Sequence, residues 1–246
     1  MFNYKLKALT YHFLASLVLI VIAVIAVFYV WYPAPLYTTT GVNQIFLILI
    51  GVSVCVWPLL TFLVSKPNKP SLKFDLSVIV ILQLLAFIFG LYHIYDGRPV
   101  WIAYNVDRFD LVRNNEMDNR KLEEALPEYR QASHWRAKYV AAVIPKENIE
   151  ISNQILFDEI GSGIAPSQRP ELYQPLRDVG DIIVARAKPI DELYDYNTEE
   201  QVEAILSQYP TADSYLPLKA SALNMVVLIN KANDNKVIEI VDLRPW

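Results

Sequence analysis

Three long apolar runs constrain what this chain can fold into more than any other feature of its sequence. They cover Tyr11–Tyr32, about Gln44–Val64 and about Phe74–Tyr95. Each run has close to the roughly 20 residues that an α-helix needs to cross the hydrocarbon core of a bilayer. The first run is too long for a secretory signal, and no Ala-x-Ala-like cleavage site follows it. We therefore expect three retained transmembrane helices.

Charge is divided along the chain in the same way. Residues 1–95 contain five Lys and one acid, Asp75, which is a net charge of +4. Residues 96–246 contain 17 basic and 25 acidic side chains, which is a net charge of −8. A single soluble globule does not separate its charge in this way. We expect a three-helix transmembrane region over 1–95 and a separate domain outside the membrane over 96–246, which the family resemblance described below places in the periplasm.

The orientation follows from the basic residues near the ends of the runs. Lys5 and Lys7 precede the first run, and three Lys lie in the Lys66–Lys73 stretch between the second and third. The loop Pro33–Asn43 has neither Lys nor Arg. Basic residues stay on the cytoplasmic side of a membrane protein. The N-terminus is therefore expected in the cytoplasm, and the chain from Asp96 onward outside.

Polar side chains inside the runs are few, and none at depth is charged. Asp75 lies at the edge of the third run beside Lys73. Ion and proton pathways usually contain intramembrane charges, so transport is not expected. Gln83, in the third run, is interpreted as the donor or acceptor of an interhelical hydrogen bond. Pro58 is expected to kink the second run.

Four stretches of the outer region have the composition of β-strands. They are Arg98–Val112, Lys138–Ile144, Asn224–Asn230 and Lys236–Leu243. The last two flank Asn233–Asn235, which is typical of a hairpin turn. Together with the helices below, they predict an α+β domain with a mainly antiparallel sheet of four or five strands.

Helices are expected between these strands. The segments are Lys121–Ala125, about Asn148–Ile160, and Thr198 to about Gln208, where Thr198 and Gln201 have capping-box spacing. Gly161-Ser-Gly163 resembles a phosphate loop only superficially, and a helix-terminating turn explains it better. Pro166–Asp191 contains four prolines and is expected to be a long loop with a short helix.

The sequence offers no set of residues suited to catalysis. The chain has one Cys and three His, which leaves little material for a metal site, and no cofactor motif is present. Asp107 and Asp110 are three apart in a strand-like stretch, so we expect them on opposite faces rather than as a catalytic pair. Asp158-Glu159 is interpreted as a solvated helix face. An enzyme is not expected, and the acidic outer domain argues against binding nucleic acid.

The remaining interpretation is a membrane-tethered binding domain. Arg98, Trp101, Arg108 and Phe109 follow the third run closely, and Trp and Arg are common in protein-protein hot spots. A structural interpretation is equally open. In it, Trp101 and Phe109 fill the core and Arg108 pairs with Asp107 or Asp110.

The three-run layout and several short motifs resemble a known family. The motifs are Arg98–Val100, Asp107–Phe109, Tyr139–Pro145 and the terminal Asp242–Trp246. Together they resemble the type IV pilin accessory proteins called TfpX/TfpZ. The resemblance covers essentially the whole chain. It implies a non-enzymatic protein of the bacterial inner membrane that acts as a chaperone for a type IV pilin, either stabilising it or helping its incorporation into the pilus.

The resemblance also directs attention to particular residues. The candidate partner-binding residues are Arg98, Trp101, Asp107, Arg108, Phe109 and Trp246. Small residues of the spans, namely Ala23, Ala26, Gly51 and Ser53, are expected to let an apolar pilin helix pack closely. Partners are then a pilin, other pilus machine subunits and the lipid bilayer. Two alternatives stay open: a scaffold component of an envelope machine, and an envelope enzyme that modifies pilin.

Overall fold

The computed structural model describes residues 2–145, 149–232 and 236–246. The chain folds into two compact units. The first consists of Met1–Tyr37 with Gly41–Gly97, and the second of Thr38–Thr40 with Arg98–Trp246. Each unit is described by itself below.

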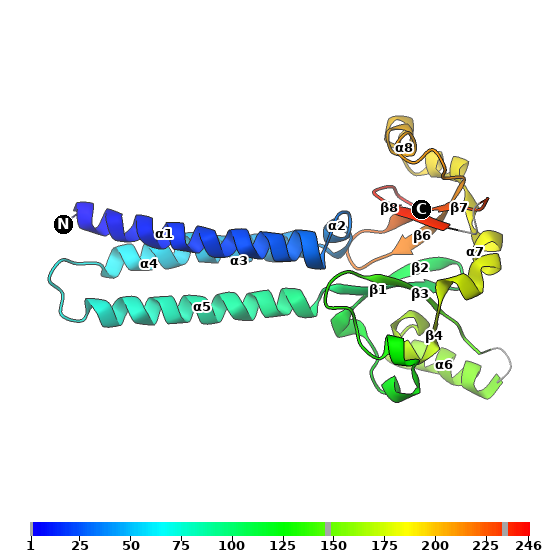
Figure 1. The fold of residues 1–246 in the computed structure, drawn as a ribbon, viewed down its shortest axis with the longest axis horizontal. Coiled ribbons are helices and arrows are strands. Elements are labelled where there is room, and N and C mark those ends of the chain that lie inside the picture. The colour runs from blue at the N-terminus through cyan, green and yellow to red at the C-terminus, as the bar shows by residue number, and fades with distance from the viewer. Residues whose placement is uncertain (1, 146–148, 233–235) are drawn as a thin grey trace. The chain divides into compact units, whose positions relative to one another are not determined.

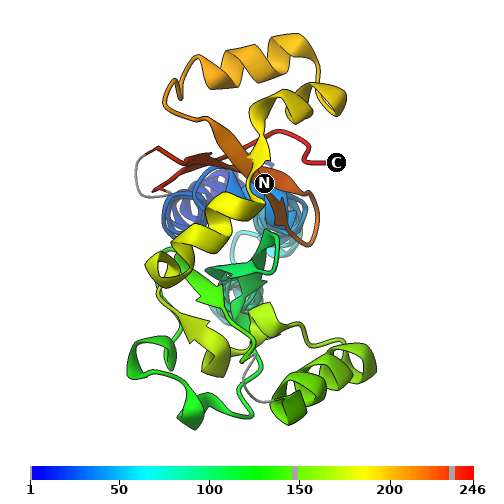
Figure 2. The same ribbon diagram turned by 90° about the vertical axis from the view of Figure 1, so that its right-hand side faces the viewer.

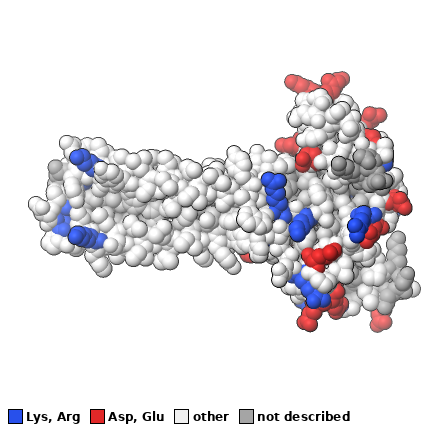
Figure 3. Space-filling view, viewed as in Figure 1, with Lys and Arg blue, Asp and Glu red and all other residues white. Residues whose placement is uncertain are grey.

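The first unit contains three helical segments that are long and apolar enough to cross a membrane. They cover Phe2–Trp31, Val42–Val64 and Leu72–Asp96. The expectation of three spans is confirmed, although the first helix begins at Phe2 rather than near Tyr11. On the face drawn in Figure 3, Lys and Arg gather at one end of this bundle.

Two of the three segments contain π-helical turns. The first segment consists of α1 (Phe2–Val24) and a π-helix at Ile25–Trp31. The second consists of α3 (Val42–Gly51), a π-helix at Val52–Val56 and α4 (Trp57–Val64). Pro58 has no backbone N–H and its ring crowds the preceding turn. The wider π-helical turn therefore lies directly before Pro58, where a regular helix would be disturbed.

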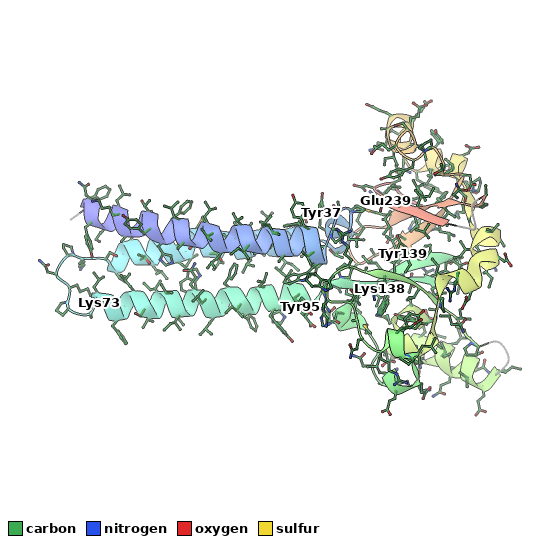
Figure 4. All side chains as sticks on the ribbon, in the orientation of Figure 1. Tyr37, Lys73, Tyr95, Lys138, Tyr139 and Glu239 are labelled. Atoms are coloured by element: carbon green, nitrogen blue, oxygen red, sulfur yellow. The ribbon has the colours of Figure 1, made fainter. Side chains whose placement is uncertain are left out.

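The third segment is the single helix α5 (Leu72–Asp96). Figure 4 shows Lys73 and Tyr95 near its opposite ends. Gly90 allows close approach to α3, since a Cβ there would lie 2.8 Å from Cδ1 of Leu49. The core of the bundle is apolar and consists of Ile20, Ala23, Val27, Tyr32, Val42, Phe46, Phe87 and Ile94. A short helix, α2 (Leu36–Thr40), follows the first segment.

The second unit is built on one mixed sheet with the strand order β4-β3-β1-β2-β6-β7-β8, and β5 also pairs with β6 (Figure 1). Its strands are β1 Pro99–Asn105, β2 Arg108–Arg113, β3 Lys138–Ala142, β4 Tyr173–Gln174, β5 Lys188–Pro189, β6 Ser214–Lys219, β7 Met225–Asn230 and β8 Lys236–Val241. Five of the seven pairings are antiparallel, and β1–β3 and β2–β6 are parallel. The predicted α+β class with a mainly antiparallel sheet is confirmed.

The number of strands was underestimated, for two local reasons. The predicted single strand Arg98–Val112 is a hairpin, because the chain turns at Val106 with a φ of 60°. Tyr104 stabilises this turn by donating from its hydroxyl to the Val106 carbonyl at 2.9 Å. Strand β6 was missed because it contains Pro217, a residue that usually marks the end of a strand.

Three α-helices belong to the second unit. They are α6 (Ile149–Ser162), α7 (Gly180–Arg186) and α8 (Glu199–Leu206). The capping box before α8 is confirmed, since Gln201 N donates to Thr198 Oγ1 at 3.3 Å and Thr198 N donates to Gln201 Oε1 at 3.2 Å. Gly163 ends α6 with a φ of +71° and donates from its N–H to the Glu159 carbonyl, so the predicted terminating turn is also confirmed.

The other predicted segments are shorter or more broken than expected. Lys121–Ala125 contains a 3-10 turn at Leu122–Glu124. The Pro166–Asp191 stretch holds 3-10 turns, the strands β4 and β5, and α7. The predicted turn at Asn233–Asn235 lies outside the described residues, although β7 and β8 pair antiparallel on either side of it.

Two apolar clusters among the described residues contribute to the core of the second unit. One packs Trp101 and Tyr173 with residues of β1, β2 and β3, and the other packs Leu193 and Leu243 with residues of β6, β7 and β8. Asn197 attaches the C-terminal segment, because its side chain accepts from Arg244 N at 2.7 Å and donates to the Arg244 carbonyl at 2.9 Å.

Candidate partner-binding surface

Three of the six candidate partner-binding residues lie in the interior of the second unit. Arg98, Trp101 and Phe109 are 2%, 1% and 0% exposed. The Trp101 ring makes edge contacts with Tyr129 and Tyr173, with ring centroids 5.8 and 5.5 Å apart. These side chains therefore support the fold, and a direct contact with a partner would require the domain to open.

Arg98 has a defined structural partner. Its Nε and Nη2 atoms donate to the Ser133 carbonyl at 3.1 and 3.0 Å. A buried guanidinium is costly unless its donors are satisfied. The two hydrogen bonds fix the segment before β3 against the start of β1.

Asp107 and Arg108 lie at the accessible turn of the β1–β2 hairpin. Arg108 reaches Asp110 at 2.9 Å and Asp107 at 3.8 Å. The predicted pairing of Arg108 with either acid is confirmed for both. The two acids do not share one strand as expected, because Asp107 belongs to the turn and Asp110 to β2. Asp110 is buried and also accepts from Asn105 Nδ2 at 3.0 Å, whereas the Asp107 side chain is 59% exposed.

Trp246 is half-exposed, at 51%. Its position is determined by the Asn197 contacts with Arg244, two residues earlier. Asp107, Arg108 and Trp246 are thus the candidate residues that a partner can reach in the folded domain. Their partner-binding role remains a prediction.

A polar cluster lies between the three spans. His12 Nδ1 is 2.5 Å from Thr61 Oγ1, and His12 Nε2 contacts Gln83 Oε1. Gln83 Nε2 donates to Ser16 Oγ at 2.8 Å. The predicted interhelical hydrogen bond of Gln83 is confirmed, and it joins α5 to α1. The contact of His12 with Thr61 adds α4 to the cluster. The part played by His12 was missed, because a sequence does not show which spans face each other.

One open polar cleft of about 240 Å³ lies beside β2 and β6. Two carboxylates line it, and both already have partners. Glu116 accepts from Arg113 N and Nη2 at 3.0 and 2.7 Å, and Asp110 is engaged as described above. Among the described residues no group of three His, Cys, Asp or Glu side chains could hold a metal ion. The two carboxylates of the cleft are thus engaged with side chains or backbone of the same domain.

The chain has three helices capable of spanning a membrane, followed in sequence by an α+β domain. These features define the class of membrane-anchored proteins with an appended domain. The family described as "Fimbrial assembly protein FimB" matches residues 1–41. The chain is 30% identical to "Fimbrial assembly protein, serogroup I" of Dichelobacter nodosus, over 97% of this chain and 96% of that protein. The serogroup E1 protein of the same organism is 29% identical over the same shares.

A third protein of Dichelobacter nodosus, named for serogroups C1 and C2, is 36% identical over 47% of this chain and 90% of its own length. No solved structure matches the chain. Because the similarity to the serogroup I protein extends over nearly the whole of both chains, this chain belongs to the fimbrial assembly protein family.

Proposed function

We propose that this protein is a non-enzymatic chaperone of the bacterial inner membrane that binds a type IV pilin and promotes its stability or its incorporation into the pilus. The observation that carries the proposal is the near full-length similarity to proteins named fimbrial assembly proteins. The similarity includes both the spans and the outer domain. The finer resemblance to the TfpX/TfpZ accessory proteins belongs to the same proposal.

The proposed topology has the N-terminus in the cytoplasm and the second unit in the periplasm. Lys5, Lys7 and the Lys66–Lys73 loop support this orientation through the positive-inside rule. Only Gly97 and Arg98 separate the end of α5 from the start of β1. The domain is thus joined to the third span by a short tether.

A client helix in the membrane would pack against the outside of the bundle. Of the four small residues expected to serve this purpose, Ala23 and Ser53 are only 1% and 3% exposed, because they pack inside the bundle. Ala26 is partly exposed, and a Cβ at Gly51 would have no neighbour within 4 Å. Ala26 and Gly51 are therefore the small residues proposed to contact a client helix.

Two weak contact sites on this protein would together hold a client, although neither site forms a tight interface. One contact is the span surface, and the other is the accessible turn of the β1–β2 hairpin with Trp246. When a client is bound at one of two linked sites, its local concentration at the other site is high. The overall affinity for the client is then higher than the affinity of either site alone. Weak individual contacts allow the client to leave, as an assembly chaperone requires.

The proposal is tested by counting pili on cells that lack this protein while measuring total pilin in the same samples. The count is repeated in cells whose pilus retraction is blocked. An assembly chaperone predicts that pili are lost and stay lost when retraction is blocked. Pili that return under that condition would instead indicate a role in the balance of extension and retraction. Unchanged pili and pilin would refute the proposal.

Two further measurements separate the alternatives. A chaperone should co-purify with unassembled pilin after mild detergent extraction, whereas a scaffold should co-purify with other machine subunits. A pilin-modifying enzyme would change the intact mass of pilin between cells with and without this protein. An identical pilin mass is the expected result.

A further inference from the structure

Helix α6 exposes a row of apolar side chains and meets the rest of the domain through the buried Ile155 and the ion pairs of Asp158. Ile149, Leu156, Phe157 and Ile160 are 74%, 47%, 72% and 83% exposed. At 3.6 residues per turn these four side chains form one stripe along the helix. Ile155, on the opposite side, is the buried residue of α6. A surface helix normally buries most of its large apolar side chains, whereas these four are exposed, with the exposed Asn153 among them by the helical repeat.

Ionic contacts hold α6 in this orientation. Asp158 lies 3.2 Å from Nη1 of Arg169 and 3.8 Å from Nη2 of Arg120. The Arg169 side chain is only 3% exposed and also pairs with Glu171 at 2.9 Å. Figure 2 shows α6 at the periphery of the domain, apart from the strands. The attachment of α6 therefore uses Asp158 and the buried Ile155, and it leaves the apolar stripe exposed.

The borders of the stripe are acidic. Glu150 lies beside Phe157 on one border, and Glu159 lies beside Leu156 on the other, by the helical repeat. The segment Ile149–Ser162 contains neither Lys nor Arg. A second copy of α6 would bring acidic borders against acidic borders, which is unfavourable. Helices that lie on membranes are rich in Lys and Arg, so a lipid surface is also a poor match.

We propose that the α6 stripe is a docking surface for a protein segment that presents apolar side chains bordered by Lys or Arg. Apolar anchors along one helix side are a recurrent mode of recognition, and the acidic borders select the charge of the partner. The inference specifies the chemistry of the bound segment and does not require that the partner is a pilin. It is therefore independent of the proposed pilin-chaperone function.

The test is photo-cross-linking in living cells with the full-length protein. A benzophenone amino acid replaces Phe157, and in a matched control it replaces Ile182, which is 46% exposed on α7. We expect a covalent adduct at position 157 in clear excess over position 182. Sequencing of the adduct should place the cross-link in a stretch of apolar residues bordered by Lys or Arg.

Charge reversal tests the borders separately from the stripe. The double substitution Glu150→Lys with Glu159→Lys should lower the adduct yield at position 157 about fivefold or more, the size expected for two exposed ion pairs turned repulsive. The matched control is Glu199→Lys with Glu203→Lys on α8, which should leave the yield unchanged. Both proteins should have the thermal unfolding temperature of the parent.

Several results would overturn the inference. They are an adduct with a second copy of this chain, an adduct with lipid alone, an attached stretch without basic residues, and a yield no higher than at position 182. A yield that is insensitive to reversal of Glu150 and Glu159 would also overturn it. The pilus count does not enter the test, so failure here is distinguishable from failure of the proposed function.

Discussion

The Nε2 atom of His12 on α1 donates a hydrogen bond to Oε1 of Gln83 on α5. The amide nitrogen of Gln83 faces Ser16, so the amide oxygen faces the imidazole and can only accept. In the neutral imidazole Nδ1 is then the acceptor, and the Thr61 hydroxyl donates to it. Each of the four side chains in the cluster thus has a hydrogen-bond partner on another span.

Replacing Gln83 with Leu should weaken the packing of the three spans. Interhelical hydrogen bonds in membranes contribute about 0.6 kcal/mol on average and up to about 1.7 kcal/mol, so loss of the two Gln83 contacts should cost about 1–2 kcal/mol. The measurement is unfolding of the purified protein in detergent. Leu85→Ala, at a position 61% exposed on the same helix, is the control and should have a smaller effect. Equal stability of Gln83→Leu and the parent would contradict a stabilising role of the cluster.

Trp101 and Trp246 should respond differently to replacement by Ala. Trp101 is 1% exposed between two tyrosines, so its loss should lower the free energy of unfolding by about 3–5 kcal/mol. Trp246 is 51% exposed, and its loss should change stability by only about 0.5 kcal/mol. Denaturant unfolding of both variants tests this. Weaker pilin capture by Trp246→Ala at unchanged stability would support its predicted partner role.

Asp118 should make the stability of the second unit depend on pH in the acid range. Three side-chain hydrogen bonds and one backbone hydrogen bond that Arg120 donates to the buried Asp118 carboxylate hold the pKa of Asp118 below the ordinary value. The unfolded chain therefore takes up the proton first, at a pKa of about 3.9. The stabilisation is complete above that value and is lost as pH falls through the lower folded pKa.

The measurement is thermal unfolding between about pH 7 and pH 3, a range that brackets the unfolded pKa. Asp118→Asn should be less stable than the parent at neutral pH and should lose less stability on acidification. Asp195→Asn, at an exposed position, is the matched control. Parallel curves for Asp118→Asn and the parent would show that the Arg120 contact contributes nothing.

The two glycines at the end of α6 should respond to Ala with opposite signs. Gly161 lies within the helix, and a Cβ there would have no neighbour within 4 Å, so Gly161→Ala should stabilise by about 0.5–1 kcal/mol. Gly163 has a φ of +71°, where a Cβ costs about 1–2 kcal/mol. Comparison of the two unfolding temperatures checks the prediction, and stabilisation by Gly163→Ala would refute the assigned turn.

Features set by local residue patterns could be predicted from the sequence. The three spans follow from runs of apolar residues, and the capping box at Thr198 follows from a spacing of three. The end of α6 at Gly163 follows from the conformational freedom of glycine. Each of these depends on neighbours within a few residues or on composition alone.

Features set by distant residues or unusual turns could not be predicted. Val106 adopts a left-handed conformation that a β-branched residue rarely takes, so its residue type gave no indication of the β1–β2 turn. The contact of His12 with Gln83 depends on which spans are neighbours. The candidate site was predicted by residue type, and burial then separated Trp101 and Phe109 from Asp107, Arg108 and Trp246.

The parallel pairing of Phe109 with Leu218 has a consequence for how the domain is synthesised. Strand β2 leaves the ribosome long before β6, its neighbour in the sheet, and pairings between such distant segments form slowly. Until β6 is made, the nascent hairpin has an unpaired edge that can join the wrong strand. Arg244 must follow as well, since Asn197 can bind it only after it has been synthesised. The rate of translation is thus expected to affect the yield of folded domain.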